Sequence, residues 1–294
     1  MVSFAQDYLG ITLFPWQRWL LIHMLELSSP GRYRFRTVVI LVARQNGKST
    51  VSQVLGLWWL YVYGVKTILS AAQDLPTAEK IWDEAVEMAK DHRELSQGIG
   101  KVVYTNGKRE LRLKRDKPFK GGSWYVKTAS RSAGRGFTGG RVLLDELREH
   151  QTWDAWGAIT KTTMAVQDAQ VVTLSNAGDD NAVVLNHLRV EAHKAVGDPD
   201  GIWREHQELA LAADLERMAE EIEDFDPDEF LDQFGDDLAI FEWSARPGCS
   251  LTDRDEWAQS NPSLGYTITE KTIASALRVD PEMSLIHNSE PTSH

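Results

Sequence analysis

The sequence predicts an α/β protein with a mostly parallel central sheet that is covered by helices on both faces. Three observations predict this fold. Short apolar runs rich in β-branched residues recur between residues 37 and 174, helical patterns separate them, and at Gly47 one run turns directly into a helix. The chain of 294 residues, 42% of them hydrophobic, is long enough to bury one large core.

The individual elements follow from local patterns. Five runs are predicted as strands that are buried on both faces: Thr37–Ala43, Thr67–Ala72, Trp124–Thr128, Val142–Leu144 and Gln170–Leu174. Apolar residues recur at helical spacing over Thr77–Lys90 and Trp153–Met164. The segment Lys101–Lys114 alternates instead around Asn106-Gly107, a dipeptide that tolerates a tight turn, so we predict a β-hairpin inserted at one edge of the sheet.

The strand patterns cease near Asp198, and an acidic, helical pattern runs from there to Leu238. We therefore expect three parts. Residues 1–195 form the core domain, residues 196–283 form an acidic helical linker or subdomain, and residues 284–294 show no periodicity. That last segment resembles a read-through tail, so we expect a truncated gene product.

The charge distribution limits the classes of partner. A net charge of -11 argues against a protein that coats nucleic acid through bulk electrostatics. Residues 214–237 are strongly acidic whereas Lys101–Lys120 is basic, so any contact with DNA is expected to be local. The apolar stretch Trp19–Leu27 contains His23 and Glu26 and is too short to span a bilayer, and the single cysteine cannot form an internal disulfide. These features predict a cytosolic protein without membrane contact.

A phosphate-binding loop, or P-loop, is predicted where the apolar strand Val38–Val42 is followed by Gly47-Lys48-Ser49 and a helical run. Gly47 lets the backbone approach phosphates, Lys48 would reach the β and γ phosphates, and Ser49 would bind Mg²⁺. The first glycine of the common motif would fall at Val42 and is absent. The motif predicts a P-loop NTPase of the ASCE, or RecA-like, class, and the alternative is a plain turn with a helix cap.

A second strand, Val142–Leu144, runs directly into Asp145-Glu146. Beside a P-loop, Asp145 would hold Mg²⁺ and Glu146 would polarise the attacking water. The simpler interpretation is an acidic start to a helix, which the helix dipole favours.

Arg44-Gln45-Asn46-Gly47-Lys48-Ser49 resembles the P-loop of bacteriophage terminase large subunits, which commonly lacks the first glycine and carries an Arg-Gln-x-Gly-Lys-[Ser/Thr] core. The resemblance covers Leu13 to Gly178 and implies an ATPase that uses ATP and Mg²⁺. It implies nucleotide contacts from these P-loop residues: Arg44, Gln45, Asn46, Gly47, Lys48, Ser49 and Thr50. The segment Leu13-Phe14-Pro15-Trp16-Gln17 looks like the family's adenine-recognition segment, in which Trp16 would pack on the base and Gln17 would pair with its edge. The start of a Trp-rich amphipathic helix is the alternative.

Two further site features follow from the resemblance. Ser175 and Asn176, at the end of another strand, resemble the coupling motif that senses the γ-phosphate, although Ser and Asn are also ordinary turn formers. The Gly-rich loop between Ser130 and Arg141 resembles the loop that supplies an arginine finger across a ring of subunits, and Arg135 is the first choice with Arg131 second. These arginines could instead contact DNA or solvent.

The basic hairpin is the local candidate for contact with the DNA backbone, through Lys108, Arg109, Arg112, Lys114 and Arg115. A solvated edge hairpin is an equally good interpretation, since lysines also block association of strand edges. The nuclease domain that follows in the family is not found, because Asp226, Asp228, Glu229 and Asp232 fall on a uniformly acidic helical stretch. We expect nuclease activity only in a full-length protein.

The resemblance implies ATP-driven translocation of double-stranded viral DNA into the procapsid. It implies work in the host-cell cytoplasm, as a homo-oligomeric ring docked on the portal protein, with a terminase small subunit supplying DNA recognition. We expect mainly monomer in solution. The alternatives are another DNA helicase or translocase, which would need a second motor domain, and a nucleotide-binding assembly module without hydrolysis, which the retention of Lys48 and Glu146 disfavours.

Overall fold

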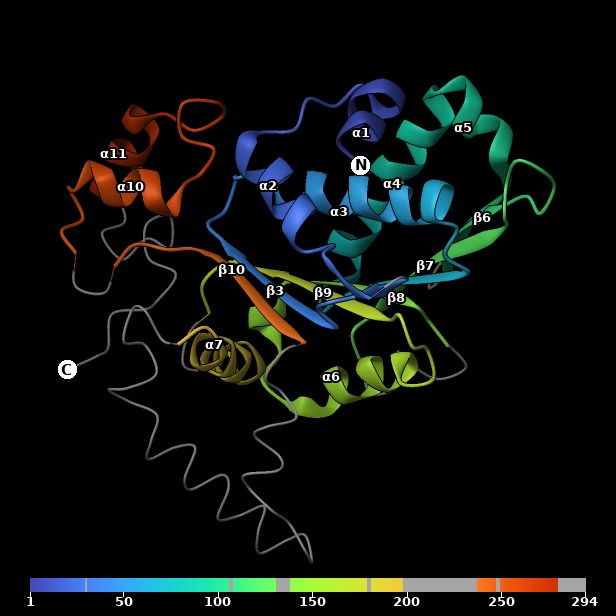
Figure 1. Cartoon of the computed structure of the whole chain (residues 1–294). Coiled ribbons are helices and arrows are strands. Elements are labelled where there is room, and N and C mark those ends of the chain that lie inside the picture. Colours follow the sequence, from blue (N-terminus) through green and yellow to red (C-terminus); the bar gives the residue numbers. More distant parts are fainter. Residues whose placement is uncertain are drawn as a thin grey trace, which may run out of the picture.

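The computed structural model describes residues 1–29, 31–105, 108–130, 138–178, 181–197, 237–246 and 249–279. Its centre is an eight-stranded sheet in the order β10-β3-β9-β8-β4-β7-β6-β5 (Figure 1). The six strands from β10 to β7 are parallel, and β6 and β5 are antiparallel. The strands of this sheet are β3 (Thr37–Val42), β4 (Thr67–Ala72), β5 (Ile99–Thr105), β6 (Lys108–Leu113), β7 (Gly122–Thr128), β8 (Arg141–Asp145), β9 (Gln170–Ser175) and β10 (Leu238–Trp243).

Helices cover both faces of the sheet. The segments α1 to α5 lie on one face, and α6 and α7 lie on the other (Figure 1). Their bounds are α1 (Val2–Leu9), α2 (Pro15–His23), α3 (Lys48–Trp58) with a π-helical extension (Trp59–Tyr63), α4 (Leu75–Asp91), α5 (Arg93–Gly98), α6 (Trp153–Thr160), α7 (Val183–Ala195), α10 (Arg254–Ser260) and α11 (Glu270–Val279). Two short 3-10 turns, Leu147–Glu149 and Lys161–Thr163, and a small β1 (Leu27–Ser29) and β2 (Arg32–Tyr33) ribbon complete the described elements. This arrangement confirms the predicted α/β fold.

The strand β3 illustrates why the sheet is buried on both faces. Its side chains alternate between two cores: Val38, Ile40 and Val42 pack under α3 and α4, whereas Val39 and Leu41 pack on the side of α6 and α7. All five are 0–1% exposed. Because successive strand residues point to opposite faces, only a continuous apolar run satisfies both cores.

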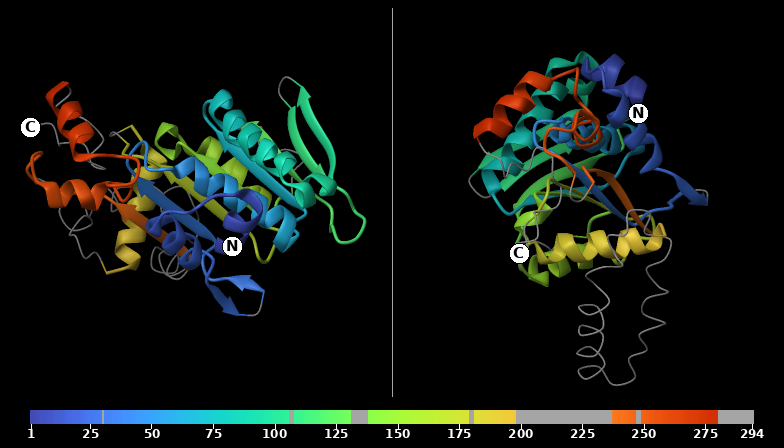
Figure 2. Two further views of the ribbon diagram at one scale, coloured as in Figure 1. Left: turned by 90° about the horizontal axis from the view of Figure 1, so that it is seen from above. Right: turned by 90° about the vertical axis from the view of Figure 1, so that its left-hand side faces the viewer.

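The predicted hairpin is present as β5 and β6 at one edge of the sheet, where β6 also pairs with β7. Seen from above, this hairpin and the α10–α11 segment lie at opposite ends of the molecule (Figure 2). The turn residues Asn106 and Gly107 lie outside the described residues.

One prediction is wrong. The sheet was expected to end before Asp198, but Leu238–Trp243 forms β10 and pairs in parallel with β3, from Leu238 opposite Thr37 to Trp243 opposite Val42. The chain therefore returns to the core inside the region expected to be a helical linker. Residues after β10 build a separate small core around Trp257, Ile268 and Ile273. Residues 198–236 and 280–294 lie outside the described residues, so the predicted acidic helix, its acidic cluster and the tail stay predictions.

Within the described ranges, each helix is too short or too polar to cross a lipid bilayer.

Candidate active site

The P-loop connects β3 to α3 and adopts a strained backbone. Gln45 and Gly47 have φ angles of 63° and 93°, in the left-handed region. Gly47 is also crowded, since a Cβ atom there would lie 2.8 Å from Gln17 Nε2. A non-glycine residue in this region costs of the order of 1 kcal/mol, so the surrounding contacts must hold Gln45 in place.

Lys48 begins α3, and its amine turns back toward the sheet. Nζ donates to the carbonyl oxygen of Val42 (2.8 Å) and to Asn176 Oδ1 (3.1 Å). Burial lowers the pKa of this amine to about 8, Arg44 and Arg148 lower it as well, and Asp145 opposes the shift. The cation is therefore held close to carboxylates but is poorly compensated, and a phosphate would stabilise it.

Asp145 ends β8 and Glu146 follows it directly. The strand β8 pairs with β9, which in turn pairs with β3. Burial raises the pKa of the Asp145 carboxyl to about 6, while the backbone N–H of Glu146, donating at 2.9 Å, and the charge of Lys48 partly offset that effect. Glu146 has a φ of 54° and is half-buried. The fold thus places a poorly compensated carboxylate and a strained neighbour at the same sheet edge as the P-loop.

Ser175 and Asn176 connect these groups. Ser175 Oγ accepts a hydrogen bond from the backbone N–H of Arg148 (3.1 Å) and donates one to the carbonyl oxygen of Asn176 (2.8 Å). Asn176 Oδ1 accepts the hydrogen bond from Lys48 Nζ. A chain of hydrogen bonds therefore runs from the P-loop through the end of β9 to the residues after β8. The predicted coupling residues lie where a change at Lys48 would reach Arg148.

The remaining P-loop residues differ in exposure. Arg44, Gln45 and Ser49 are exposed, and Thr50 is half-buried in the first turn of α3. A helix N-terminus with open side chains around it is a suitable place for phosphate.

The predicted magnesium ligands are an exposed hydroxyl, Ser49, and the poorly compensated carboxylate of Asp145. Both are oxygen donors of the kind that Mg²⁺ prefers, so the donor set fits this ion. Across the residues that the structure describes, no group of three or more His, Cys, Asp or Glu side chains could hold a metal by itself. Phosphate and water oxygens would have to complete the coordination.

Trp16 and Gln17 lie beside the P-loop but are turned to other partners. Trp16 is 6% exposed, contacts Trp243 edge-on and donates its indole N–H to Ser263 Oγ at 3.0 Å. Gln17 Nε2 donates to the carbonyl oxygen of Gly47 at 3.0 Å, and Gln17 Oε1 accepts the N–H of Phe14. Both side chains are buried within the protein. Their recognition of the adenine base stays a prediction, and in this structure Gln17 supports the loop through its bond to Gly47.

The predicted arginine fingers, Arg131 and Arg135, lie outside the described residues. Arg141, at the other end of the same segment, is structural. Its guanidinium is buried, donates to the carbonyl oxygen of Gly140 and to Asp168, and lies against three aromatic rings.

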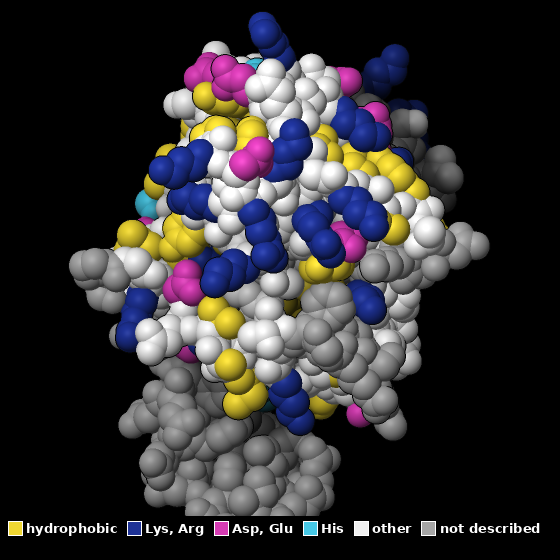
Figure 3. All heavy atoms as spheres, turned by 90° about the vertical axis from the view of Figure 1, so that its right-hand side faces the viewer, with side chains coloured by type: hydrophobic (Ala, Val, Ile, Leu, Met, Phe, Trp, Pro, Cys, Tyr) yellow, Lys and Arg dark blue, Asp and Glu magenta, His cyan; other side chains and the backbone are white. Residues whose placement is uncertain are grey.

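The basic hairpin carries both paired and open cations. Arg109 is 18% exposed and pairs with Glu79 (3.2 Å) and Asp83 (3.7 Å), and Arg112 pairs with Glu110. Lys114 and Arg115 are exposed, and the side chain of Lys108 is not described. Lys and Arg side chains gather across the face of the molecule on which the hairpin lies (Figure 3). DNA contact stays a prediction, and Arg109 is the least suited to it.

Sequence reasoning missed several residues near the site. Asn261 and Ser263 contact the P-loop from the far end of the chain. His150, four residues after Glu146, is buried, and both ring nitrogens are without a hydrogen-bond partner in the described part of the chain. Burial lowers its pKa, and it lines a cavity of about 510 Å³ with Ser130, Glu149 and other polar residues. No local pattern marks these residues.

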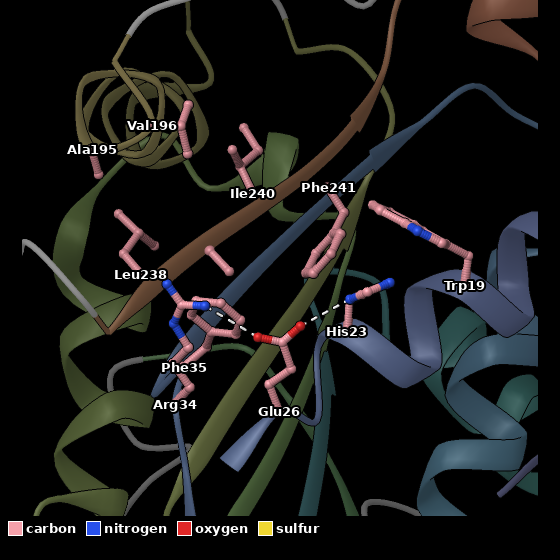
Figure 4. Close-up of a pocket in the computed structure, with 11 residues that line it drawn as sticks. Trp19, His23, Glu26, Arg34, Phe35, Ala195, Val196, Leu238, Ile240 and Phe241 are labelled. Carbon is pink, nitrogen blue, oxygen red and sulfur yellow. Dashed lines mark hydrogen bonds and ion pairs between the residues drawn. The ribbon is translucent and has the colours of Figure 1, made fainter. Parts of the chain in front are cut away.

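A second cavity, of about 280 Å³, lies beside β10 and away from the predicted site. Figure 4 shows Trp19 and His23 of α2 on one side and Leu238, Ile240 and Phe241 of β10 on the other. At its rim, Glu26 joins His23 (2.9 Å) and Arg34 (3.1 Å). None of the predicted site residues lines this cavity.

Comparison with known proteins bears on the fold. No protein-family model matches the chain, and no curated protein matches it. Among solved structures, the chain is similar to the large terminase of bacteriophage HK97, with a TM-score of 0.67 and 18% identity over 95% of this chain and 51% of that one. It is also similar to the large terminase of a thermophilic bacteriophage, with a TM-score of 0.53 and 12% identity over 95% of this chain and 53% of that one. For the same thermophilic-phage terminase crystallised with ADP, the TM-score is 0.51 and the identity 13%, over 90% of this chain and 50% of that one.

A P-loop between β3 and α3, with Asp145-Glu146 on a nearby parallel strand, defines a P-loop NTPase fold. More particularly, the chain has the fold of the bacteriophage large terminases that it matches. It spans about half their length.

Proposed function

We propose that this chain is the ATPase motor part of a bacteriophage terminase large subunit, which hydrolyses ATP to translocate double-stranded DNA into a procapsid. The observation that carries the proposal is the hydrogen-bonded chain from Lys48 through Asn176 and Ser175 to Arg148. It joins the predicted P-loop to the predicted coupling residues and reaches the backbone two residues after Glu146. The similarity in fold to the HK97 and thermophilic-phage terminases, the latter also crystallised with ADP and with ATP-γ-S, supports the same proposal.

The chemistry follows from the side chains. Lys48 would leave the carbonyl oxygen of Val42 and bind the β and γ phosphates, which relieves its uncompensated burial. Ser49 and Asp145 would hold Mg²⁺, and this ion when bound would neutralise charge on the phosphates. Glu146 would orient and polarise the attacking water. Arg135, or Arg131, would supply positive charge to the transition state from within the chain or from a neighbouring subunit.

Lys48 also provides a route for coupling. Its amine bonds Asn176, so phosphate binding would exchange one partner of Asn176 for another. Because Ser175 holds the backbone of Arg148, the change would reach the residues that follow Glu146. This is the behaviour expected of a γ-phosphate sensor.

The partners belong to the same proposal. We propose double-stranded DNA as the translocated substrate, the portal protein and the terminase small subunit as partners, and a ring of copies of the chain at the procapsid in the host cytoplasm. The hairpin side chains Lys114 and Arg115 are the best placed to contact DNA phosphates, since both are exposed.

The first experiment measures magnesium-dependent ATP hydrolysis, with and without double-stranded DNA, by the unaltered chain and by Glu146→Gln and Lys48→Ala. We expect each substitution to reduce turnover by about a hundredfold or more. Glu94→Gln, an exposed carboxylate on α5, is the matched control and should hydrolyse ATP normally. If the unaltered chain binds ATP but all proteins are equally inert, a non-hydrolysing binding module is the better account.

A second experiment tests the DNA surface. The double variant Lys114→Gln/Arg115→Gln should bind double-stranded DNA more weakly and lower the slope of log affinity against log salt by about 2. Arg109→Gln, which removes a cation already paired with Glu79, should change that slope much less. Equal slopes for all three proteins would remove the hairpin from the proposal.

A further inference from the structure

One P-loop residue, Asn46, is hydrogen-bonded to two residues from the C-terminal part of the chain, Asn261 and Ser263. We refer to them as the loop clasp. Asn46 Nδ2 donates to Asn261 Oδ1 (3.1 Å), and Asn46 Oδ1 accepts the backbone N–H of Ser263 (3.0 Å). Ser263 Oγ donates to the carbonyl oxygen of Asn46 (2.8 Å). Both the side chain and the backbone of Asn46 are therefore held by residues more than 200 positions away in the sequence, and Nδ2 also donates to the carbonyl oxygens of Ala43 and Arg44 within the loop.

The position of Asn46 gives this clasp its importance. It lies between Gln45 and Gly47, the two residues of the loop with positive φ angles. Such conformations persist only where neighbouring structure fixes them. Asn46, Asn261 and Ser263 are each 0% exposed, so water does not compete for these hydrogen bonds.

The clasp is itself rigidly supported. Hydrogen bonds to α10 fix Asn261, since both its backbone N–H (3.0 Å) and its Nδ2 (3.2 Å) donate to the carbonyl oxygen of Trp257. Trp257 belongs to the small core that follows β10. On the other side, Ser263 Oγ accepts the indole N–H of Trp16, whose neighbour Gln17 donates to Gly47. The loop is thus held from α2 and from the residues around α10 at once.

We propose that Asn261 and Ser263 are positioning residues of the nucleotide site, which hold Asn46 so that the P-loop is shaped for phosphate before nucleotide arrives. The inference rests on the proposed ATPase function. It makes nucleotide affinity depend on the docking of residues 249–279 against the core. Because coupling between two sites is reciprocal, bound nucleotide should tighten that docking by the same factor.

The test combines binding and turnover in three variants: Asn46→Ala, Asn261→Ala and the double variant. Titration calorimetry should show ATP binding weakened by about tenfold in each single variant, because each removes the buried hydrogen bond that joins Asn46 to Asn261. For Asn261→Ala, which lies outside the predicted nucleotide contacts, the KM for ATP should rise with little change in turnover at saturating ATP. The double variant should bind no more weakly than Asn46→Ala, since that substitution already removes the bond to Asn261.

Thr272→Ala is the matched control. It lies in the same C-terminal segment, is exposed, and its side chain bonds only to Thr269 among the hydrogen bonds described for it. It should bind ATP as the unaltered chain does. A loss of affinity in Thr272→Ala equal to that in Asn261→Ala would assign the effect to general loosening of the segment and overturn the inference.

A second measurement uses the unaltered protein, so its result does not depend on whether the variants fold. Hydrogen exchange at the Ser263 amide reports the bond to Asn46 directly, and ATP should slow this exchange. If the chain binds ATP while Ser263 exchange and Asn261→Ala affinity are both unchanged, the inference fails and the ATPase proposal stands. If the unaltered chain neither binds nor hydrolyses ATP, the proposed function fails and the inference fails with it.

Discussion

Two half-buried carboxylates near the ends of parallel strands, Glu242 and Asp145, differ in how fully their charge is compensated. Glu242, in β10, accepts hydrogen bonds from Arg189 Nη2 (2.6 Å), from Arg189 Nε, which is shared between its two oxygens (3.0 and 3.1 Å), and from Ser244 Oγ (2.7 Å), and it contacts His193 Nε2 (2.9 Å). Burial alone would raise its pKa, but His193, Arg189 and Ser244 together hold it at about 2. Asp145, at the end of β8, receives the N–H of Glu146, and burial raises its pKa to about 6.

The difference separates structural charge from functional charge. Where a carboxylate serves the fold, the protein supplies enough donors to stabilise the ionised form. At Asp145 the compensation is incomplete, although the position is similarly enclosed. A cation brought by the substrate would complete it, which is consistent with the proposed magnesium site. Strong, uncompensated burial of a titratable group is a frequent property of active sites.

The largest effect is expected from Glu242→Gln. It leaves Arg189, 15% exposed, without its charge partner and should lower the free energy of unfolding by about 2–3 kcal/mol at pH 7. Urea unfolding measures this change. Since the pKa of Glu242 lies below its usual value, its stabilisation is present above about pH 4.5 and is lost as the pH falls toward 2, so the cost of the substitution should shrink in acid.

Glu270→Gln, which removes an exposed ion pair, is the control for Glu242→Gln. Glu270→Gln removes the exposed pair with Arg254, in which the two side chains are 51% and 73% exposed, and should change stability by less than about 0.5 kcal/mol. If Glu242→Gln costs no more than Glu270→Gln, the partner set around Glu242 contributes little and the contrast with Asp145 is broken.

A smaller effect of opposite sign is expected from Asp145→Asn. Removing a poorly compensated charge should raise the free energy of unfolding by about 1 kcal/mol at pH 7.5, a gain limited because Lys48 loses the opposite charge that favours it most. ATP hydrolysis should be lost in the same protein. Unfolding and turnover assays on one preparation measure both, and a clear loss of stability would contradict the account of Asp145.

The pH profile of this difference sharpens the comparison further. The pKa of Asp145 is raised, so in the folded state the group stays protonated while the unfolded chain ionises above about pH 4. The stability of the unaltered protein relative to Asp145→Asn should therefore fall as the pH rises from about 4 to about 6 and then stay constant. For Glu242→Gln the relative stability of the unaltered protein should rise over the acid range. If relative stability changed with pH in the same direction for both substitutions, the two carboxylates would not differ in charge compensation, and the contrast drawn here would be wrong.

The fold and much of the site could be predicted because their signals are local. The runs that became β3, β8 and β9 are apolar on both faces, and a loop such as Arg44 to Ser49 carries its chemistry in adjacent residues. Strand ends in a parallel sheet meet at one edge, so placing Lys48, Asp145 and Asn176 together required only the strand assignments.

The rest depended on contacts between distant residues. The strand β10 is short, contains Glu242 and follows an acidic stretch, and nothing in the sequence specifies that it pairs with a strand 200 positions earlier. Asn261 and Ser263 are ordinary turn residues until Asn46 is placed beside them. Trp16 and Gln17, predicted to recognise adenine, lie beside the loop, and their partners Ser263 and Gly47 could not be predicted from spacing.

The parallel pairing of β10 with β3 has a mechanical consequence. All six residues of β10 are paired in register with the strand that leads into the P-loop. Tension on the chain beyond Trp243 pulls along the strand, so the ladder of backbone hydrogen bonds is loaded in shear and its bonds share the force. A hairpin such as β5 and β6, pulled apart at its two open ends, would instead release its bonds one at a time. The strand β10 therefore forms a stiff joint through which force on the C-terminal residues reaches the loop that would hold the phosphates.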